Sequence, residues 1–411
     1  MKARVSFRPV CAALGIAIFA VATSANAAVH RVFPGNSIQA VIDAAAPGDT
    51  VLVEPGTYYG TDPKYGLRIT QHNLRLIGKV KQGRGEAGKV RILHTGTQET
   101  GVYAAPAGCD YNVQANTPLG RDCNGRKVQG FYIRGFTVEG FPVNGIQTRW
   151  VDGFEFVRNE SVNNLNNGIY PTLSANGLVQ NNVSYGSLDT AMWVAGSENV
   201  RVIGNELFGS VIGFEITVSN NVWVTQNTIY DNTVGIGLFH PNGAGNPPLP
   251  VMANWVVEHN DVRDNNRPNE AVPGTFQSVL PPGIGILVTG VSDHVIAKNT
   301  VEDNDFVGIA VLGWCTANND TPNNCFAKPP ITDPRANNNL IAQNKVSGNG
   351  SAAPPISINF LAADVTYYQL EALFGFGSAF GNCFEKNKPS GFSFVSSQPD
   401  GQLPTDGCRK P

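Results

Sequence analysis

The sequence between residues 145 and 310 repeats a short pattern at a nearly constant interval. A small residue followed by an apolar one recurs in steps of 22 or 23 residues, at Gly145-Ile146, Gly168-Ile169, Ala191-Met192, Gly213-Phe214 and Gly235-Ile236. The pairs Gly285-Ile286 and Gly308-Ile309 are again 23 residues apart. A repeat this short, rich in Val, Ile, Asn and Gly, is typical of a solenoid in which each repeat forms one turn of β-structure. The sequence therefore predicts an all-β solenoid over most of the chain.

An Asn residue also recurs once per repeat, each time after an apolar pair. These residues are Asn159, Asn181, Asn205, Asn227, Asn260, Asn299 and Asn344. Stacked Asn side chains can hydrogen-bond from one coil to the next, and Asn tolerates left-handed turn geometry. A second series, at Asn232, Asn265, Asn304 and Asn349, predicts another ladder of the same kind.

Three aspartates directly precede members of the second series: Asp231, Asp264 and Asp303. Asp is a favoured turn residue, so we expect these side chains to serve the turns. Stacked carboxylates and carbonyls could instead bind Ca²⁺. We expect no cofactor and no metal at a catalytic site, with calcium at these turns as the alternative.

The first 27 residues have the composition of a secretory signal peptide. Three basic residues, Lys2, Arg4 and Arg8, precede an apolar run over residues 10–22. The run is followed by Ala25-Asn26-Ala27, whose small residues suit cleavage. The apolar run is too short to span a membrane, and no later stretch is long and apolar enough. We therefore expect a secreted or periplasmic protein that is cleaved after Ala27.

The charge of the remaining chain excludes one class of partner. Without the three basic residues of the leader, 26 basic residues face 32 acidic ones, which gives a net charge of −6. A nucleic-acid-binding protein needs a basic face, so we expect no nucleic-acid partner. A neutral glycan, or an acidic one held at a local basic spot, remains compatible with this charge. The oligomeric state is not indicated.

Six cysteines remain after the leader, and an even number in an exported protein favours disulfides. They form sequence-local pairs that each bracket a segment rich in Gly, Pro or Asn: Cys109–Cys123, Cys315–Cys325 and Cys383–Cys408. A metal cluster is the alternative, but the sequence has no C-x-x-C spacing and little His.

The N-terminal region combines a short helix with a strand. Apolar residues at helical spacing predict a helix over residues 37–46, with Ser37 as its N-cap, and a strand over residues 50–53. A helix at this point would cover the first coil of the solenoid. The run from Ser37 to Tyr58 resembles the opening of proteins with a right-handed parallel β-helix, the pectate-lyase-like fold. The later repeats resemble the parallel β-helix repeat of that superfamily.

The resemblance implies one right-handed parallel β-helix over residues 28–350, with residues 351–411 as a C-terminal cap or tail. Residues 100–127 interrupt the rhythm and are expected to form a loop stapled by the first cysteine pair. Further insertions rich in Pro, Gly and Asn follow at residues 240–253, 267–282 and 315–337. Because long loops in compact proteins are often functional, we expect these three to form walls around one groove.

The alternation of strand residues predicts which side chains face outward. Ile146, Ile169, Met192 and their equivalents are apolar and are taken as inward, so the residues between them point out. One outward column is Gln147, Tyr170, Trp193, Glu215, Gly237, Leu287 and Ala310. The next is Arg149, Thr172, Ala195, Thr217, Phe239, Thr289 and Leu312. Neighbouring members of a column should be about 4.8 Å apart, the spacing of strands.

Two aromatic residues beside a carboxylate make the first column a candidate binding surface. Tyr170 and Trp193 should lie on consecutive strands, followed by Glu215. An exposed aromatic patch marks a binding site, and sugar rings pack well on indole and phenol groups. We therefore expect a polysaccharide or oligosaccharide partner, bound by Tyr170, Trp193, Gln147 and Phe239. Alternatively, the insertions fold over this face and bury the aromatic rings.

Asp189 and Glu215 are the candidate chemical pair. They lie on adjacent coils and could be about 5–10 Å apart, the range used by the acid/base pairs of glycosidases. Either could also abstract a proton next to a uronate carboxylate. In that reaction Arg149 would balance the carboxylate, and Tyr170 or His240 would donate a proton.

The superfamily that the chain resembles includes polysaccharide lyases, polygalacturonase-type hydrolases and uronate epimerases, which use a groove along the first sheet. The Asp-Pro-His run of the epimerases is absent, and the nearest match is Phe239-His240-Pro241. The three-Asp cluster of the hydrolases and the Arg-x-Pro motif of the pectate lyases are also missing. We expect a lyase or epimerase that acts on an acidic polysaccharide by proton abstraction, with a hydrolase as a less favoured enzyme. The alternative is a non-catalytic β-helix that binds glycan or assists assembly of a periplasmic or envelope protein.

Overall fold

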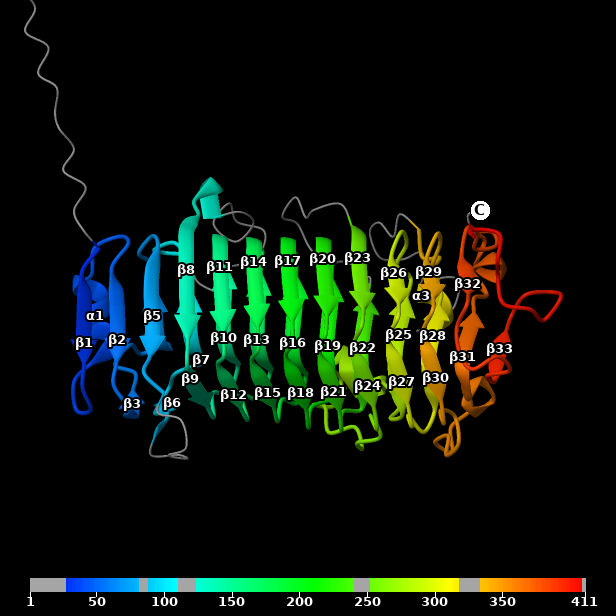
Figure 1. The fold of residues 1–411 in the computed structure, drawn as a ribbon, viewed down its shortest axis with the longest axis horizontal. Helices are drawn as coiled ribbons and strands as arrows, with labels where there is room; N and C mark the ends of the chain where they lie inside the picture. Colours follow the sequence, from blue (N-terminus) through cyan, green and yellow to red (C-terminus); the bar gives the residue numbers. More distant parts are fainter. Residues whose placement is uncertain (1–26, 81–87, 110–122, 240–251, 318–332, 409–411) are drawn as a thin grey trace, which may run out of the picture.

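The computed structural model describes residues 27–80, 88–109, 123–239, 252–317 and 333–408. Their strands form three long parallel sheets that run side by side along one axis (Figure 1). Each coil of the chain visits the sheets in the order A, B, C and then returns to sheet A one strand further along. The predicted all-β solenoid is confirmed.

Sheet A has 12 strands. They are β1 (Val29–Val32), β2 (Thr50–Val53), β5 (Leu74–Gly78), β8 (Val128–Arg134), β11 (Val151–Val157), β14 (Ala175–Gln180), β17 (Glu198–Ile203), β20 (Asn220–Thr225), β23 (Ala253–Glu258), β26 (Val295–Ala297), β29 (Leu340–Ala342) and β32 (Cys383–Glu385).

Sheet B has 10 strands. They are β3 (Gly56–Tyr59), β6 (Val90–Leu93), β9 (Phe136–Glu139), β12 (Glu160–Val162), β15 (Val183–Tyr185), β18 (Glu206–Phe208), β21 (Thr228–Tyr230), β24 (Asp261–Arg263), β27 (Thr300–Glu302) and β30 (Lys345–Ser347).

Sheet C has 11 strands. They are β4 (Tyr65–Ile69), β7 (Thr100–Ala104), β10 (Asn144–Arg149), β13 (Asn167–Thr172), β16 (Thr190–Ala195), β19 (Ile212–Thr217), β22 (Val234–Phe239), β25 (Ile284–Thr289), β28 (Val307–Leu312), β31 (Ala363–Tyr368) and β33 (Phe394–Ser396).

The inward side chains of all three sheets form one continuous apolar core. It runs from Val32 to Phe384 along the whole axis. The predicted inward residues of sheet C are all fully buried in this core, namely Ile146, Ile169, Met192, Phe214, Ile236, Ile286 and Ile309. The alternation of the strand residues therefore predicts the inward register of sheet C correctly.

Helix α1 (Ile38–Ala44) closes the N-terminal end of the core, at the blue end of Figure 1. The Ser37 side chain accepts a hydrogen bond from the Ala40 amide, as an N-cap does. Ile38 and Ile42 are buried in the same core cluster as the first strands. The predicted helix and its N-cap are confirmed.

The two Asn ladders are present, with one correction. In the turns from sheet A to sheet B, Asn159, Asn182, Asn205, Asn227, Asn260, Asn299, Asn344 and Asn387 hydrogen-bond in series. The sequence prediction of Asn181 in this series was wrong. Asn181 is exposed and has a φ of 54°, and the same left-handed position is filled by Arg158 and Gln226 in other coils.

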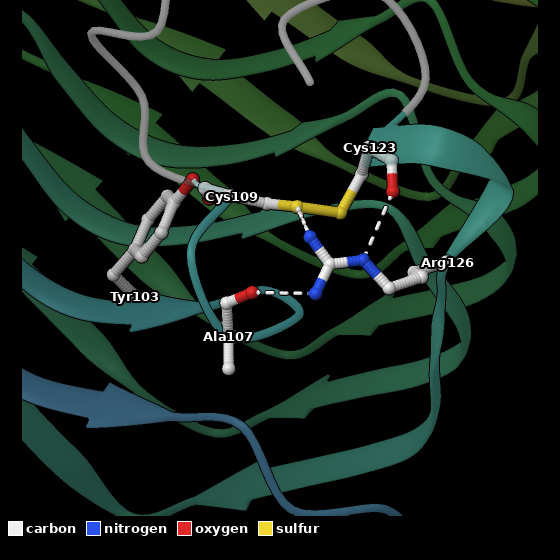
Figure 2. Close-up of a disulfide and its surroundings, with 5 residues drawn as sticks. All are labelled: Tyr103, Ala107, Cys109, Cys123 and Arg126. Atoms are coloured by element: carbon white, nitrogen blue, oxygen red, sulfur yellow. Dashed lines mark hydrogen bonds between the residues drawn. A yellow bond between two sulfur atoms is a disulfide. The ribbon is translucent and has the colours of Figure 1, made fainter. Parts of the chain in front are cut away.

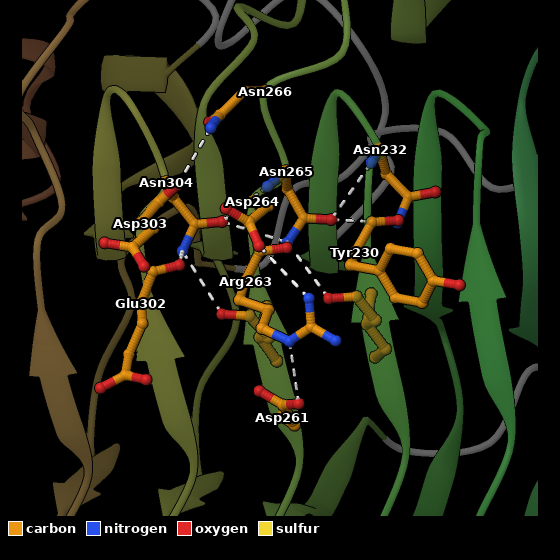
Figure 3. A network of polar contacts seen from close by, with 12 residues as sticks. Tyr230, Asn232, Asp261, Arg263, Asp264, Asn265, Asn266, Glu302, Asp303 and Asn304 are labelled. Carbon is orange, nitrogen blue, oxygen red and sulfur yellow. Dashed lines mark hydrogen bonds and ion pairs between the residues drawn. The ribbon is translucent and has the colours of Figure 1, made fainter.

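The second ladder lies in the turns from sheet B to sheet C and includes the predicted Asn232, Asn265, Asn304 and Asn349 (Figure 3). It ends on Asp364, whose Oδ1 accepts from Asn349. Both ladders satisfy buried polar groups, because each amide bridges to the next coil and to a backbone carbonyl.

Residues 351–411, expected to form a cap or tail, contribute further strands. β31 pairs with β28, β32 with β29, and β33 with β31, so sheets A and C continue beyond residue 350. The chain after β33 then covers β32, since the Phe384 amide donates to the Pro404 carbonyl and Cys383 is bonded to Cys408.

The disulfide Cys109–Cys123 is also present, whereas the predicted partner of Cys315, Cys325, lies outside the described residues. The predicted signal peptide lies outside them too, except for Ala27. Among the helices of the described chain, none has the length and apolar character needed to cross a membrane.

Candidate functional site

Long connections leave or enter sheet C at both of its edges and thereby mark its outward face. Residues 105–127, 240–252 and 313–339 connect sheet C to sheet A, whereas residues 264–283 and 348–362 connect sheet B to sheet C. The sequence predicts three walls at successive strand positions. The structure distributes these segments over two opposite edges, so the face between them is the candidate site.

The predicted outward columns are aligned on this face. Gln147 is paired with Tyr170, Trp193 with Glu215, and Glu215 with Gly237. Their side chains are nevertheless largely covered. Gln147, Tyr170 and Glu215 are buried, and Trp193 is half-buried. The expectation that Tyr170 forms part of an exposed aromatic patch was wrong. Tyr170 is instead covered by other parts of the chain, which was the alternative expectation.

Tyr170 and Trp193 stack on each other. Their ring centroids are 4.6 Å apart and their planes differ by 12°. The indole Nε1 of Trp193 donates a hydrogen bond to Thr217 Oγ1, 2.9 Å away, which fixes the orientation of the ring. One face of each ring is occupied by the other ring. A ligand can therefore reach the edges of the stack, or the face of Trp193 that points toward Glu215.

Asp189 and Glu215 are joined by the hydroxyl of Thr190. Thr190 Oγ1 lies 3.0 Å from Asp189 Oδ1 and 2.8 Å from Glu215 Oε2, so the two carboxyl oxygens are within about 6 Å of each other. A hydroxyl has only one hydrogen to donate. Both contacts are hydrogen bonds only when one carboxyl group is protonated and donates to Thr190.

Burial determines which carboxyl group holds the proton. Burial raises the pKa of Glu215 well above its usual range, and the nearby charge of Asp189 raises it further. Burial also raises the pKa of Asp189, to about 7, although hydrogen bonds from Thr190 and Gln277 oppose this shift. Glu215, the more deeply buried of the two, is therefore the partner that more strongly favours its protonated form. When Glu215 holds the proton it donates to Thr190, whose hydroxyl is then free to donate to Asp189.

The surroundings of the pair explain its burial. Gln277 belongs to η3 (Phe276–Val279), a short helix in the insertion between β24 and β25, and reaches Asp189 from above the sheet. On the next strand Gly237 leaves room for the Phe239 ring, because a Cβ at Gly237 would lie 2.4 Å from a ring carbon. The ring therefore occupies the space beside Glu215.

Arg149 is not part of this cluster. It lies on β10, three strands from the Glu215 strand, which is about 14 Å along the axis. Its guanidinium lies over the Trp150 ring, 4.0 Å from the centroid. Phe239, predicted as a substrate-binding residue, is buried in an apolar cluster with Leu280 and Leu287. His240 lies outside the described residues.

The first disulfide supports the Arg149 end of the face (Figure 2). Trp150 packs against Cys109 and Cys123 in one buried cluster. Arg126 donates to the carbonyls of Ala107 and Cys123 and thereby closes the segment around the disulfide. The insertion before β8 is thus anchored against the turn that follows β10.

The three aspartates of the second ladder serve the turns. Asp231, Asp264 and Asp303 have φ values of 53°, 52° and 56°, the left-handed geometry that Gly209 and Gly348 adopt in other coils. Asp264 pairs with Arg263 (Figure 3), and Asp231 pairs with Arg267, so two of the carboxylates already have cationic partners.

In the described part of the chain, only Cys383, Glu385 and Cys408 bring three metal-ligating side chains together. Because these two cysteines form a disulfide, this cluster does not have the ligands of a metal site.

Sequence reasoning missed Thr190 and Gln277. Strict alternation from Met192 places Thr190 inward, but in the structure the residue before each small–apolar pair lies on the outer face. These residues form a third column: Asn144, Asn167, Thr190, Ile212, Val234, Ile284 and Val307. Thr190 is its last polar member before the column becomes apolar. Gln277 carries no comparable signal, because the course of an insertion does not follow the repeat.

The family model described as "Right handed beta helix region" matches residues 144–326 of the sequence. Together with the three parallel sheets, this match decides the architecture. This chain is a right-handed parallel β-helix. No curated protein sequence matched it.

Solved structures with the same fold include several from proteins named for carbohydrates. The A-module of mannuronan C-5 epimerase AlgE4 from Azotobacter vinelandii has 16% identity and a TM-score of 0.51, over 88% of this chain and 95% of that one. DFA-IIIase from Arthrobacter chlorophenolicus A6, without its lid, has 13% identity and a TM-score of 0.54, over 91% and 90%. The Dettilon tailspike protein has 14% identity and a TM-score of 0.51, over 91% of this chain and 61% of that one. At these identities the likeness of the β-helix to each structure concerns the fold.

Proposed function

We propose that this β-helix is an exported enzyme that acts on a carbohydrate by general acid–base catalysis, with Asp189 transferring the proton. The observation that carries the proposal is the hydrogen-bonded series from Glu215 through Thr190 to Asp189. A carboxyl group with a pKa of about 7 exchanges a proton readily near neutral pH, which general acid–base catalysis requires.

Asp189 is the group that would contact the substrate, since it is only partly covered whereas Glu215 is buried. Glu215 and Thr190 are positioning residues. Protonated Glu215 directs the Thr190 hydroxyl toward Asp189, so the Asp189 carboxylate is stabilised when it has given up its proton. Trp193, oriented by Thr217 and supported by Tyr170, would hold a sugar ring beside the acid.

The reaction that suits this site best is the cleavage or transfer of a glycosidic bond at a sugar that carries no charged group. Protonated Asp189 would give its proton to the glycosidic oxygen as the C–O bond breaks. Its carboxylate would then take a proton from the water or sugar hydroxyl that attacks the anomeric carbon. Arg149, the cation expected to balance a uronate, lies two strands from Asp189, about 10 Å along the axis, and its guanidinium lies over the Trp150 ring. This distance favours a neutral reacting sugar.

The second candidate is the proton abstraction expected from the sequence, as in a lyase or epimerase on an acidic polysaccharide. The pKa of Asp189 favours it, because a base that titrates near 7 is suited to abstraction at neutral pH. Arg149 and Gln147 would then contact a more distant acidic sugar of the polymer. The structural likeness to a mannuronan C-5 epimerase supports a carbohydrate in either case. Two disulfides support export through the leader of residues 1–27.

Three readouts on the purified mature protein separate these candidates. We would incubate it with neutral and acidic glycans and measure new reducing ends, unsaturated uronate absorbance and exchange of solvent deuterium into the sugar. Reducing ends from a neutral glycan, lost in Asp189→Asn, are the expected result. Unsaturated product or deuterium exchange would select the lyase or epimerase. Binding of glycan with none of the three signals would reject catalysis and leave a glycan-binding protein.

A further inference from the structure

The outward face of sheet C changes from polar to apolar at β19. On β10, β13 and β16 the outward columns carry Asn144, Gln147, Arg149, Asn167, Tyr170, Thr172, Thr190, Trp193 and Ala195. On β22, β25 and β28 they carry Val234, Gly237, Phe239, Ile284, Leu287, Thr289, Val307, Ala310 and Leu312. Glu215 lies at the boundary. A single face thus offers a polar half and an apolar half, with the carboxyl pair between them.

A pocket of about 100 Å³ lies on the apolar half. Its floor includes Leu287, Ala310 and Thr366 on β25, β28 and β31, and Phe239 on β22 borders it. One wall is the insertion that carries Phe276 and Leu280, and the other is the segment Ile358–Leu361. The Thr366 hydroxyl donates to the Leu361 carbonyl and holds this second wall on the sheet.

The rim of the pocket is apolar and open to solvent. Val279 is 74% exposed, and Phe276 and Ile358 are 36% and 38% exposed. Exposed apolar side chains gathered around a concave site indicate that something apolar binds there. Inside, Thr289 is buried, and its hydroxyl has no hydrogen-bond partner within the described residues. It offers one polar contact inside the pocket, at the carboxyl end of β25.

The pocket and the carboxyl pair share their walls. Phe276 packs against Phe239 at 5.3 Å between ring centroids, and the next residue, Gln277, lies close enough to Asp189 for its side chain to lower the pKa of that carboxyl group. The Phe239 ring occupies the space over Gly237, the neighbour of Glu215. A molecule with its head at Asp189 therefore has its tail directed over Phe239 toward Leu287.

We propose that this pocket binds the aliphatic chain of an amphipathic carbohydrate whose sugar lies against Trp193 and Asp189. The pocket borders four successive strands, three steps of about 4.8 Å, and its lining is almost entirely apolar. An apolar site that extends over several strands suits an extended alkyl chain. The assignment of the sugar end rests on the proposed function, whereas the chain end rests on the pocket alone.

The test is a titration of n-butyl, n-hexyl and n-octyl β-D-glucosides below their micellar concentrations, followed by calorimetry. Affinity should rise about fourfold for each methylene group that enters the pocket, the transfer free energy of a CH₂ group expressed as an affinity ratio. The rise should stop when the pocket is full. Ala310→Val fills part of the pocket floor and Ala310→Phe fills more of it. The increase in affinity should therefore end at a shorter alkyl chain in the first variant and at a still shorter one in the second. The milder variant keeps the test decisive when the larger one does not fold.

Ala40→Phe adds the same ring on exposed α1, at the other end of the molecule, and should bind as the wild type does. Affinity that is independent of chain length, or unchanged by both Ala310 variants, would overturn the proposal. Chain-length dependence without turnover of any glycan would support the pocket and reject the catalytic reading. Turnover without chain-length dependence would support catalysis and reject the pocket.

Discussion

A single hydroxyl group makes two acidic residues share one proton. Thr190 contacts both Asp189 and Glu215, and its one hydrogen cannot satisfy two ionised carboxylates. Burial of Glu215 raises its pKa and so favours a proton held within the pair. The arrangement costs folding free energy, since the Asp189 carboxylate must ionise in a partly covered site. Such a cost is common where the chemistry of a site requires it.

The cost has a defined dependence on pH. Because the pKa of Asp189 is raised from 3.8 to about 7, the folded protein binds more protons than the unfolded chain between these values. Wild-type stability should therefore fall as the pH rises through this window. Asp189→Asn removes the charge and should be more stable than the wild type at about pH 8, with little difference at about pH 4. Chemical denaturation at both pH values measures this, with Asp231→Asn at an exposed turn as the control. A parallel pH dependence of wild type and Asp189→Asn would contradict the prediction.

Thr190→Val tests the role of the hydroxyl. It keeps the shape of the side chain but removes both hydrogen bonds. Because the bond from Thr190 lowers the pKa of Asp189, its loss should move the pH–rate profile to higher pH. We expect kcat to fall about tenfold to a hundredfold, within the range of general acid–base contributions. Thr233→Val, at a buried threonine that contacts neither carboxyl group, should leave the profile in place. A lower rate with an unmoved profile would indicate a purely structural role.

At the scale of the elements, the turns hold the coils in register. From β11 onward, the turn that follows each strand of sheet A has one left-handed residue followed by one ladder Asn. In one coil both are Asn, at positions 181 and 182. The structure distinguishes them, because only Asn182 hydrogen-bonds to both Asn159 and Asn205.

These two neighbours should respond differently to substitution. Asn182→Ala removes the acceptor of the Asn159 amide groups and the donor to the Phe156 carbonyl, which leaves buried polar groups unpaired. We expect a loss of about 3 kcal/mol or more in the free energy of unfolding. Asn181→Gly keeps the left-handed geometry at an exposed site and should change it by less than about 1 kcal/mol. Urea denaturation of both variants provides the comparison, and equal losses would reject the assignment of the ladder.

The same scale shows what the sequence could and could not predict. Strand alternation placed Ile169 inward and Glu215 outward, because the repeat applies to every coil. Burial of Tyr170 and the contact of Gln277 with Asp189 were not predicted. They depend on the insertions, whose residues follow no period and whose course is decided by packing on the sheet. The repeat thus predicts the framework of the site, while the insertions set its solvent access and its pKa values.

At the scale of the whole molecule, an open solenoid must protect its ends. α1 covers the N-terminal end of the core, and β1 is a short edge strand whose His30 and Arg31 pair with Asp49 and Glu54. At the other end the chain after β33 lies over β32.

Loss of the N-terminal cover should cause self-association. Ile42→Asp places a charge in the buried face of α1 and should detach the helix from the first coils. We expect soluble oligomers or aggregates by size-exclusion chromatography with light scattering, at a protein concentration at which the wild type shows none. Ala40→Asp, on the exposed face of the same helix, is the matched control and should behave as the wild type does. An unaffected elution profile for Ile42→Asp would mean that α1 is dispensable.

The Asn ladders fix the register of successive coils. One extra residue inside a strand would turn every following side chain of that strand to the opposite face and would move the next ladder Asn out of reach. Extra residues between sheet B and sheet C, after Asn265 for example, do not change the register, because the next strand begins at Ile284 after the insertion. Changes in chain length are thereby directed to the edges of sheet C. Those edges surround the candidate site, so new contacts can be gained there while the coils stay in phase.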